Sequence, residues 1–144
     1  MAQRDWVQQH IDRYRATGGE EGHIWGGQDG SLALPCLLLT TTGRKPGKQT
    51  TTALIYGKDG DDHVIIASTG GRPAHPLWYY NIMADPKVEL QVKADEFGAV
   101  AETVTGAERA RLWRMMAEIY PPYDEYQERA KATREIPVVV LKRR

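Results

Sequence analysis

Two pairs of expected strands are joined by connections that are too short to hold a crossover helix. Residues 50–57 and 63–68 both have strand composition, and only the turn-forming residues 58–62 separate them. Residues 87–93 alternate strictly between apolar and polar side chains, and residues 96–104 follow at once as a hairpin partner. Parallel strands need a crossover of a dozen or more residues, so both pairs are expected to be antiparallel. This excludes a parallel nucleotide-binding sheet.

The remaining elements complete a small α+β domain of about six strands. Helices are expected over residues 3–17, over 76–84, and after Thr105, where Thr105 and Glu108 form a capping box. Strands buried on both faces are expected near 32–41 and 136–141. These elements predict one domain over residues 1–144. Within it, residues 33–141 are expected to form an antiparallel β-barrel with helices packed outside.

Composition excludes several classes of protein. The 144 residues carry 19 basic and 19 acidic side chains, and the basic ones form no extended stripe, so nucleic-acid binding is not expected. The single cysteine, Cys36, excludes an internal disulfide, and the four histidines lack metal-ligand spacing, so no metal is expected. No apolar run approaches the roughly 18 residues of a membrane span, and the sequence suggests a cytoplasmic protein.

A cationic turn follows the first long strand, in the segment Gly43-Arg44-Lys45-Pro46-Gly47-Lys48. The two glycines allow backbone amides to converge, Arg44 can bind a phosphate with two parallel hydrogen bonds, and Lys45 and Lys48 add charge. The turn is not a Walker loop, because its glycine and hydroxyl residues are misplaced. It predicts a site for a polyanionic tail, with an ordinary solvated hairpin turn as the alternative.

Three more segments carry candidate ligand-binding residues. The loop 68–72 has two glycines beside hydroxyl residues, which lets backbone approach a flat ligand, although it could be a plain connection. The segment 77–81 combines aromatic residues with Asn81, which could bond a ring carbonyl. Tyr120, Tyr123 and Tyr126 flank a Pro-Pro pair, and each phenol needs a partner, so they suit either a wet aromatic wall or the end of the barrel.

Together these segments resemble the deazaflavin-dependent nitroreductase family, whose members use coenzyme F420 and are also described as F420-dependent quinone reductases. The resemblance rests on these residues: Leu39-Thr40-Thr41-Thr42-Gly43-Arg44-Lys45-x-Gly47, Gly70-Gly71, Pro76-x-Trp78-Tyr79-x-Asn81, Asp85-Pro86, and Tyr120-Pro121-x-Tyr123-x-x-Tyr126 before Ile136-Pro137-Val138. It implies a split β-barrel and hydride transfer from the reduced cofactor to an electron-poor acceptor. The family's acceptors include quinones, enones, lactones such as coumarins and aflatoxins, and nitroimidazoles.

The resemblance also implies roles for individual residues. The phosphate and glutamyl tail of the cofactor would meet Arg44, Lys45 and Pro46, with Lys48 compensating for basic residues that some relatives carry where this chain has Thr50 and Thr69. The deazaflavin ring would lie along the strand Thr50, Thr51, Thr52, Ala53, Leu54, Ile55. It would be closed in by Ile66, Ala67, Ser68, Thr69 and by Leu77, Trp78, Tyr79, Tyr80, Asn81. Tyr123 would touch both cofactor and substrate.

Hydroxyl groups are the expected catalytic donors. Hydride addition to a quinone or enone creates an oxyanion, and phenols (pKa about 10) stay protonated at neutral pH. The candidates are Ser68, Tyr120, Tyr123 and Tyr126, with Tyr123 and Tyr126 first.

Two other functions remain open at this point: an FMN-dependent oxidoreductase of related barrel architecture, and a protein that binds deazaflavin without turnover. The partner is expected to be a small-molecule acceptor, and the chain a monomer or a homodimer. Helix 3–17 either packs on the domain or touches the inner face of a membrane through Trp6.

Overall fold

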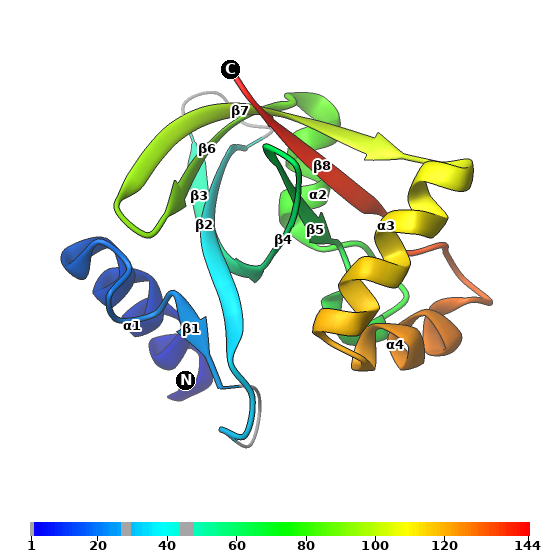
Figure 1. Cartoon of the computed structure of the whole chain (residues 1–144), viewed down its shortest axis with the longest axis horizontal. Coiled ribbons are helices and arrows are strands. Elements are labelled where there is room, and N and C mark those ends of the chain that lie inside the picture. Colours follow the sequence, from blue (N-terminus) through cyan, green and yellow to red (C-terminus); the bar gives the residue numbers. More distant parts are fainter. Residues whose placement is uncertain (1, 27–29, 44–47) are drawn as a thin grey trace.

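The computed structural model describes residues 2–26, 30–43 and 48–144 of the chain (Figure 1). The helices are α1 (Ala2–Thr17), α2 (Leu77–Ala84), α3 (Gly106–Ile119), α4 (Pro122–Ala130) and a 3-10 turn, η1 (Thr69–Gly71). The strands are β1 (Ile24–Trp25), β2 (Leu34–Thr42), β3 (Gln49–Ile55), β4 (Gly57–Asp59), β5 (Asp62–Ile66), β6 (Lys87–Val92), β7 (Asp95–Val104) and β8 (Val138–Arg143). Residues 44–47, which carry most of the cationic turn, lie outside the described residues.

The strands form one antiparallel sheet in the order β1-β2-β6-β7-β8-β5-β4, and β3 pairs with the other edge of β2. The predicted hairpin of β6 and β7 is present, with Lys87 opposite Val100 and Val92 opposite Asp95. The predicted antiparallel α+β fold is therefore confirmed.

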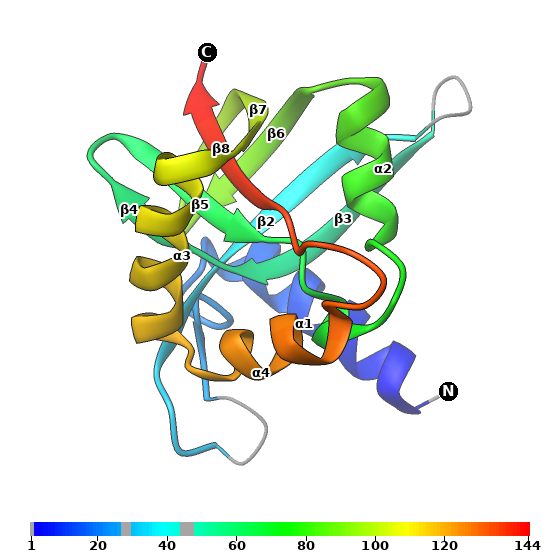
Figure 2. The same ribbon diagram turned by 90° about the vertical axis from the view of Figure 1, so that its right-hand side faces the viewer.

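The two outer strands of this sheet are consecutive in the chain. β3 and β4 lie at opposite ends of the strand order, yet only Tyr56 separates them. The sheet must therefore curl until β3 and β4 come together at Tyr56, while β3 keeps one edge unpaired, which gives a split barrel (Figure 2). The expected single strand over 50–57 is wrong. The backbone N of Tyr56 makes the last hydrogen bond to β2, to Pro35 O, and from Gly57 onward the chain pairs with β5.

Alternation along the strands separates two hydrophobic cores. In β8, Val139 and Leu141 belong to the core inside the barrel, whereas Val138 and Val140 pack beneath α3 and α4. This is why the strand reads as a continuous apolar run. On the far side of the molecule (Figure 1), α1 packs on β2 mainly through Tyr14, whose hydroxyl donates to Cys36 O at 2.9 Å and accepts from Lys93 N at 2.8 Å.

The start of α3 differs from the expected capping box. Thr105 is the N-cap residue, but its side chain makes no capping hydrogen bond. Glu108 instead pairs with Arg111 at 3.0 Å, and Arg111 also binds Asp59 at 2.9 Å. The carboxylate therefore helps to join α3 to the β4–β5 hairpin rather than capping its own helix. Within the described residues, no helix has the length and apolar character needed to span a membrane.

Candidate active site

A cavity of about 320 Å³ opens between α1 on one side and α4 on the other, above the edge of the barrel. Eight of the residues singled out from the sequence line it: Ala53, Leu54, Ile55, Ile66, Ser68, Tyr120, Tyr123 and Tyr126. They come from β3, from β5 and its exit, and from the region around α4, so segments more than 70 residues apart in sequence meet at one site.

β3 presents an unpaired backbone edge to this cavity. Gly43 N donates to Lys48 O and Tyr56 N donates to Pro35 O, so the even-numbered residues of β3 exchange their hydrogen bonds with β2. Thr51, Ala53 and Ile55 consequently direct their N–H and C=O groups toward the free edge. Ala53 and Ile55 also line the cavity. An edge of alternating donors and acceptors suits a flat ring that itself carries carbonyl and N–H groups.

The tyrosines are both core residues and cavity residues. Tyr120 and Tyr123 are buried in the cluster beneath α3 and α4, and Tyr126 packs against them. The hydroxyls of Tyr120 and Tyr126 lie 3.2 Å apart and hydrogen-bond each other. The Tyr123 hydroxyl has no hydrogen-bond partner among the described residues and is not sealed by protein, so it reaches the cavity surface.

Burial keeps these phenols protonated. It raises the pKa of Tyr120 to about 12, with a further contribution from the hydrogen bond to Tyr126. The same desolvation raises the pKa of Tyr123 still further above its usual range. At neutral pH both side chains are therefore hydrogen-bond donors and not phenolates.

Ser68 lies where β5 ends and η1 begins. Its backbone carbonyl is fully used, since it accepts from Gly71 N at 2.9 Å and from Arg134 Nη2 at 2.7 Å. Its side-chain hydroxyl makes no hydrogen bond to another described residue and lines the cavity. Two hydroxyls without a partner among the described residues, those of Ser68 and Tyr123, thus line the same cavity.

The structure places the α2 residues elsewhere. Trp78 and Tyr79 are buried inside the barrel, whereas Leu77 is 57% exposed and Tyr80 is also exposed. Buried Asn81 donates from Nδ2 to Thr41 Oγ1 at 3.0 Å and to Thr50 Oγ1 at 3.3 Å. α2 therefore lies beside the end of β2 and β3 that leads into the cationic turn (Figure 2), and none of its residues lines the cavity.

β3 connects these two places. Its seven residues span about 20 Å, from Ala53 and Ile55 at the cavity to the exposed Lys48 next to the turn. Along that length Gln49 is exposed and the other six residues, Thr52 among them, are partly exposed. A long cofactor with a flat ring at one end and an anionic tail at the other fits this strand. Arg44, Lys45 and Pro46 lie outside the described residues, while Ala67 and Thr69 flank Ser68 in the sequence and are not among the lining residues.

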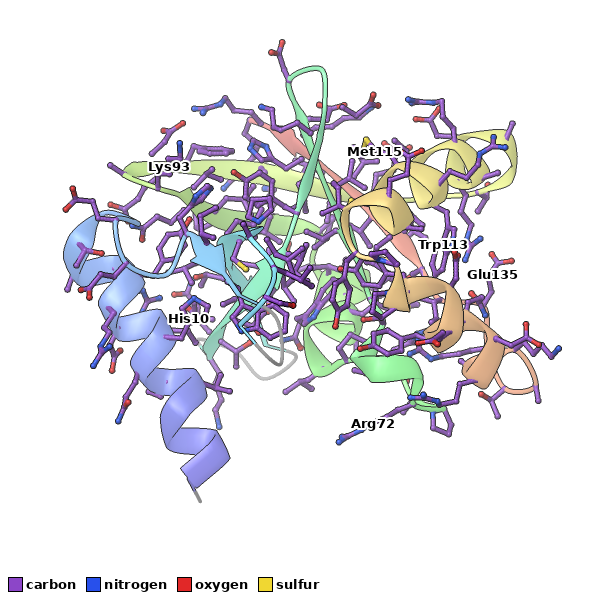
Figure 3. All side chains as sticks on the ribbon, turned by 60° about the horizontal axis from the view of Figure 1, so that its bottom comes forward. His10, Arg72, Lys93, Trp113, Met115 and Glu135 are labelled. Atoms are coloured by element: carbon purple, nitrogen blue, oxygen red, sulfur yellow. The ribbon has the colours of Figure 1, made fainter. Side chains whose placement is uncertain are left out.

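Five further residues line the cavity: Gly70, from the loop 68–72 that was expected to approach a flat ligand, and Val7, His10, Trp25 and Cys36, which were not anticipated. Val7 and His10 come from α1, and His10 lies on the side of that helix that faces the sheet, with Nε2 2.8 Å from Gly22 O (Figure 3). Cys36 was expected to be an inert core residue, and burial does raise the pKa of its thiol to about 12. Only the folded chain brings these unanticipated residues to the cavity, and no local pattern marks them. No cluster of three or more potential metal ligands occurs in the described part of the chain.

Comparisons with known proteins identify the family of this chain. Residues 6–143 match the F420H(2)-dependent quinone reductase family. An F420H(2)-dependent quinone reductase of Mycobacterium tuberculosis is 41% identical over 151 residues, which cover 96% of this chain and 97% of the relative. A solved F420-H2 dependent reductase superposes with a TM-score of 0.69 at 38% identity, over 75% of this chain and 94% of the other.

A second similar structure is described as a domain-swapped dimer. It has a TM-score of 0.71 at 34% identity and covers 96% of this chain and 98% of its own. Whether this chain is a monomer or a homodimer stays a prediction, as do its cytoplasmic location and the contact of α1 with a membrane. The match along nearly the whole length decides the family. The chain belongs to the F420H(2)-dependent quinone reductase family, a family of enzymes whose cofactor is coenzyme F420.

Proposed function

We propose that this protein transfers a hydride from reduced coenzyme F420 to a flat, electron-poor acceptor in the cavity, with a quinone as the first candidate. The observation that carries the proposal is the pair of hydroxyls, from Ser68 and Tyr123, that lack partners among the described residues and line the same cavity as Ala53 and Ile55 of the free β3 edge. Family membership supports the cofactor and the acceptor class.

The cofactor would be held along β3. Thr51, Ala53 and Ile55 would offer backbone donors and acceptors to its ring, and Lys48 with the neighbouring Arg44 and Lys45 would bind its anionic tail. When bound, the reduced deazaflavin supplies the hydride, and the protein supplies binding and orientation. α2 would contribute indirectly, because Asn81 fixes Thr41 and Thr50 of the two strands that support the tail end.

The residues of the cavity would stabilise the product. Reduction of a quinone or an enone places negative charge on an oxygen, and Ser68 and Tyr123 can donate to that atom. In the Tyr120–Tyr126 pair one hydroxyl donates to the other, which leaves the second proton of the pair free for the acceptor. Removing one such preorganised donor typically costs 10²–10³-fold in kcat, on the order of 3 kcal/mol.

The cavity also limits the size and polarity of the acceptor. Its volume of about 320 Å³ is at the lower end for small-molecule sites, and Ile55, Ile66 and Trp25 contribute apolar walls. Because Ala53 and Ile55 line the same cavity, the cofactor ring and the acceptor would share this space, which favours a small, flat acceptor. The proposal therefore extends to enones, coumarin-type lactones and nitroimidazoles, while aflatoxins, which have more fused rings, are weaker candidates.

The test is to mix the protein with reduced F420 and menadione and to follow reoxidation of the cofactor by its absorbance. We expect multiple turnovers, and quenching of F420 fluorescence on binding. FMN in the same assay separates the FMN-dependent alternative, since tight FMN binding with no F420 binding would contradict the proposal. Tight F420 binding without turnover of menadione, a coumarin or a cyclic enone would indicate a storage or delivery protein instead.

A further inference from the structure

The guanidinium of Arg134 uses all five of its N–H donors on acceptors within residues 67–75. Arginine has five such donors in a rigid planar arrangement. Their acceptors are Arg72 O at 3.0 Å from Nε, Ala67 O and His75 Nδ1 at 2.9 Å from Nη1, and Ser68 O at 2.7 Å and Thr69 Oγ1 at 2.8 Å from Nη2. No donor remains for another role, so the side chain is committed to holding residues 67–75.

The loop that Arg134 holds has a strained backbone. Thr69, Gly70 and Gly71 follow one another with φ of 43°, 65° and 80°. A left-handed conformation is easy for glycine but costly for threonine, and such strain persists only where the surroundings impose it. Thr69 Oγ1 accepts from Arg134 and lies 2.8 Å from Ser68 O and 2.9 Å from Ala74 O, so the hydroxyl fixes the turn from inside.

The backbone of Arg134 is held to α4, the helix that carries Tyr123 and Tyr126. Arg134 follows α4, and Gln127 of α4 donates to Arg134 O at 3.3 Å while its Oε1 accepts from Ile136 N at 2.8 Å. The loop also meets α4 directly, because a Cβ on Gly71 would lie only 2.8 Å from Tyr126 O. One arginine therefore spans the two segments that carry the hydroxyls without protein partners.

We propose that Arg134 is a positioning residue, which fixes the Ser68 hydroxyl relative to the Tyr123 hydroxyl so that both reach the same acceptor oxygen. The catalytic role of Arg134 rests on the proposed function. Its role in holding loop 67–75 does not, because that role concerns the protein without cofactor or acceptor.

The substitutions are Arg134→Gln, which keeps an amide donor but loses the charge and the fork, and Arg134→Lys, which keeps the charge but offers three donors. The matched control is Arg72→Gln, which removes the same charge from the same loop. The Arg72 side chain is exposed, points away from the body of the protein (Figure 3), and makes no side-chain hydrogen bond to a described residue.

The first measurement is amide hydrogen exchange of residues 68–75 in the cofactor-free protein. We expect both Arg134 variants to exchange about tenfold faster there than wild type, with the rest of the barrel unchanged, because the local opening has lost its main restraint. The Arg72→Gln control should exchange like wild type. Unchanged exchange in both Arg134 variants would overturn the inference, and if Arg134→Gln does not fold, Arg134→Lys decides alone.

The second measurement is a double-mutant cycle on kcat with reduced F420 and menadione. Ser68→Ala should cost about tenfold or more in wild type but less than about twofold in the Arg134→Gln background, where Ser68 is already misplaced. F420 binding, measured by fluorescence, should stay within about twofold, because the cofactor strand is untouched. Fully additive losses would overturn the inference. A wild type without turnover would instead refute the proposed function, while the exchange data still decide whether Arg134 holds the loop.

Discussion

α2 and α4 are both short helices rich in aromatic residues, and the fold uses them differently. Trp78 and Tyr79 of α2 fill the inside of the barrel, and the Tyr79 hydroxyl is paired with Thr103 Oγ1 at 2.9 Å. Tyr123 of α4 is equally buried, but its hydroxyl has no partner in the described structure and faces a cavity. A hydroxyl that reaches a cavity without a partner among the described residues is available to a ligand. The difference therefore separates a helix that supports the barrel from one that forms a candidate site.

The largest expected effect is on stability, from Trp78→Ala. The side chain is 7% exposed within the barrel core, so its removal leaves a large cavity and should lower the free energy of unfolding by about 3–5 kcal/mol. Urea unfolding measures this. The matched control is Leu77→Ala, one position earlier and 57% exposed, which should change stability by less than about 0.5 kcal/mol. Equal effects at the two positions would mean that α2 is not a core helix.

Tyr123→Phe should produce the opposite pattern, a large loss of activity with little loss of stability. We expect kcat with menadione to fall about 10²-fold, because one donor to the acceptor oxygen is removed. The melting temperature should hardly change, since no internal hydrogen bond is lost.

Tyr79→Phe is the matched control for this change. It removes a hydroxyl bonded to Thr103, so stability should fall by about 1 kcal/mol while kcat is retained. A wild-type kcat for Tyr123→Phe would show that this hydroxyl only shapes the cavity, and would remove the functional half of the comparison.

Asn81→Ala should have an intermediate effect. Asn81 is 2% exposed and donates to the hydroxyls of Thr41 and Thr50, so its loss removes both hydrogen bonds and leaves these two hydroxyls bonded only to each other, at a cost of about 1–3 kcal/mol. If the tail end of the cofactor depends on β2 and β3 being held together, F420 affinity should weaken as well, with kcat at saturation unchanged. Fluorescence titration measures the affinity. A loss of kcat alone would place Asn81 nearer the chemistry than the structure does.

The smallest expected effect is a dependence of stability on pH. Burial lowers the pKa of His75, with a further contribution from nearby Arg134, and burial likewise lowers the pKa of His23 and His63. Below the ordinary value of about 6.5 the unfolded chain binds protons before the folded chain does. Stability should therefore fall as the pH drops from about 6.5 through the lowered folded-state pKa values.

Thermal unfolding between pH 7.5 and pH 5 checks this, and the melting temperature should decrease by a few degrees. His75→Gln should reduce the slope, because it removes the histidine that lies between Arg134 and the ring of Tyr79. A melting temperature that rises on acidification would contradict the assignment of these histidines as neutral in the fold.

Local patterns were sufficient wherever the chain's own neighbours decide the structure. The strict alternation of residues 87–93 and the short turn after it predict the β6–β7 hairpin, and the spacing of Leu112, Met116 and Ile119 predicts α3. The same reasoning failed at Tyr56, where the composition of a strand continues but the partner changes from β2 to β5. It also failed at Glu108, which forms an ion pair with Arg111 instead of capping the first turn of α3.

The sequence by itself determined the antiparallel fold and the kinds of group available to the site, because strand period, turn length and residue chemistry are local properties. Only the tertiary structure decided which of those groups work together. It closed the sheet at Tyr56, brought Ser68 and Tyr123 to one cavity, turned Trp78 and Asn81 inward, and bound Arg134 to a loop more than 60 residues away. The physical reason is that a hydroxyl or an aromatic ring becomes a support or a site through its long-range partners, and no local pattern records these.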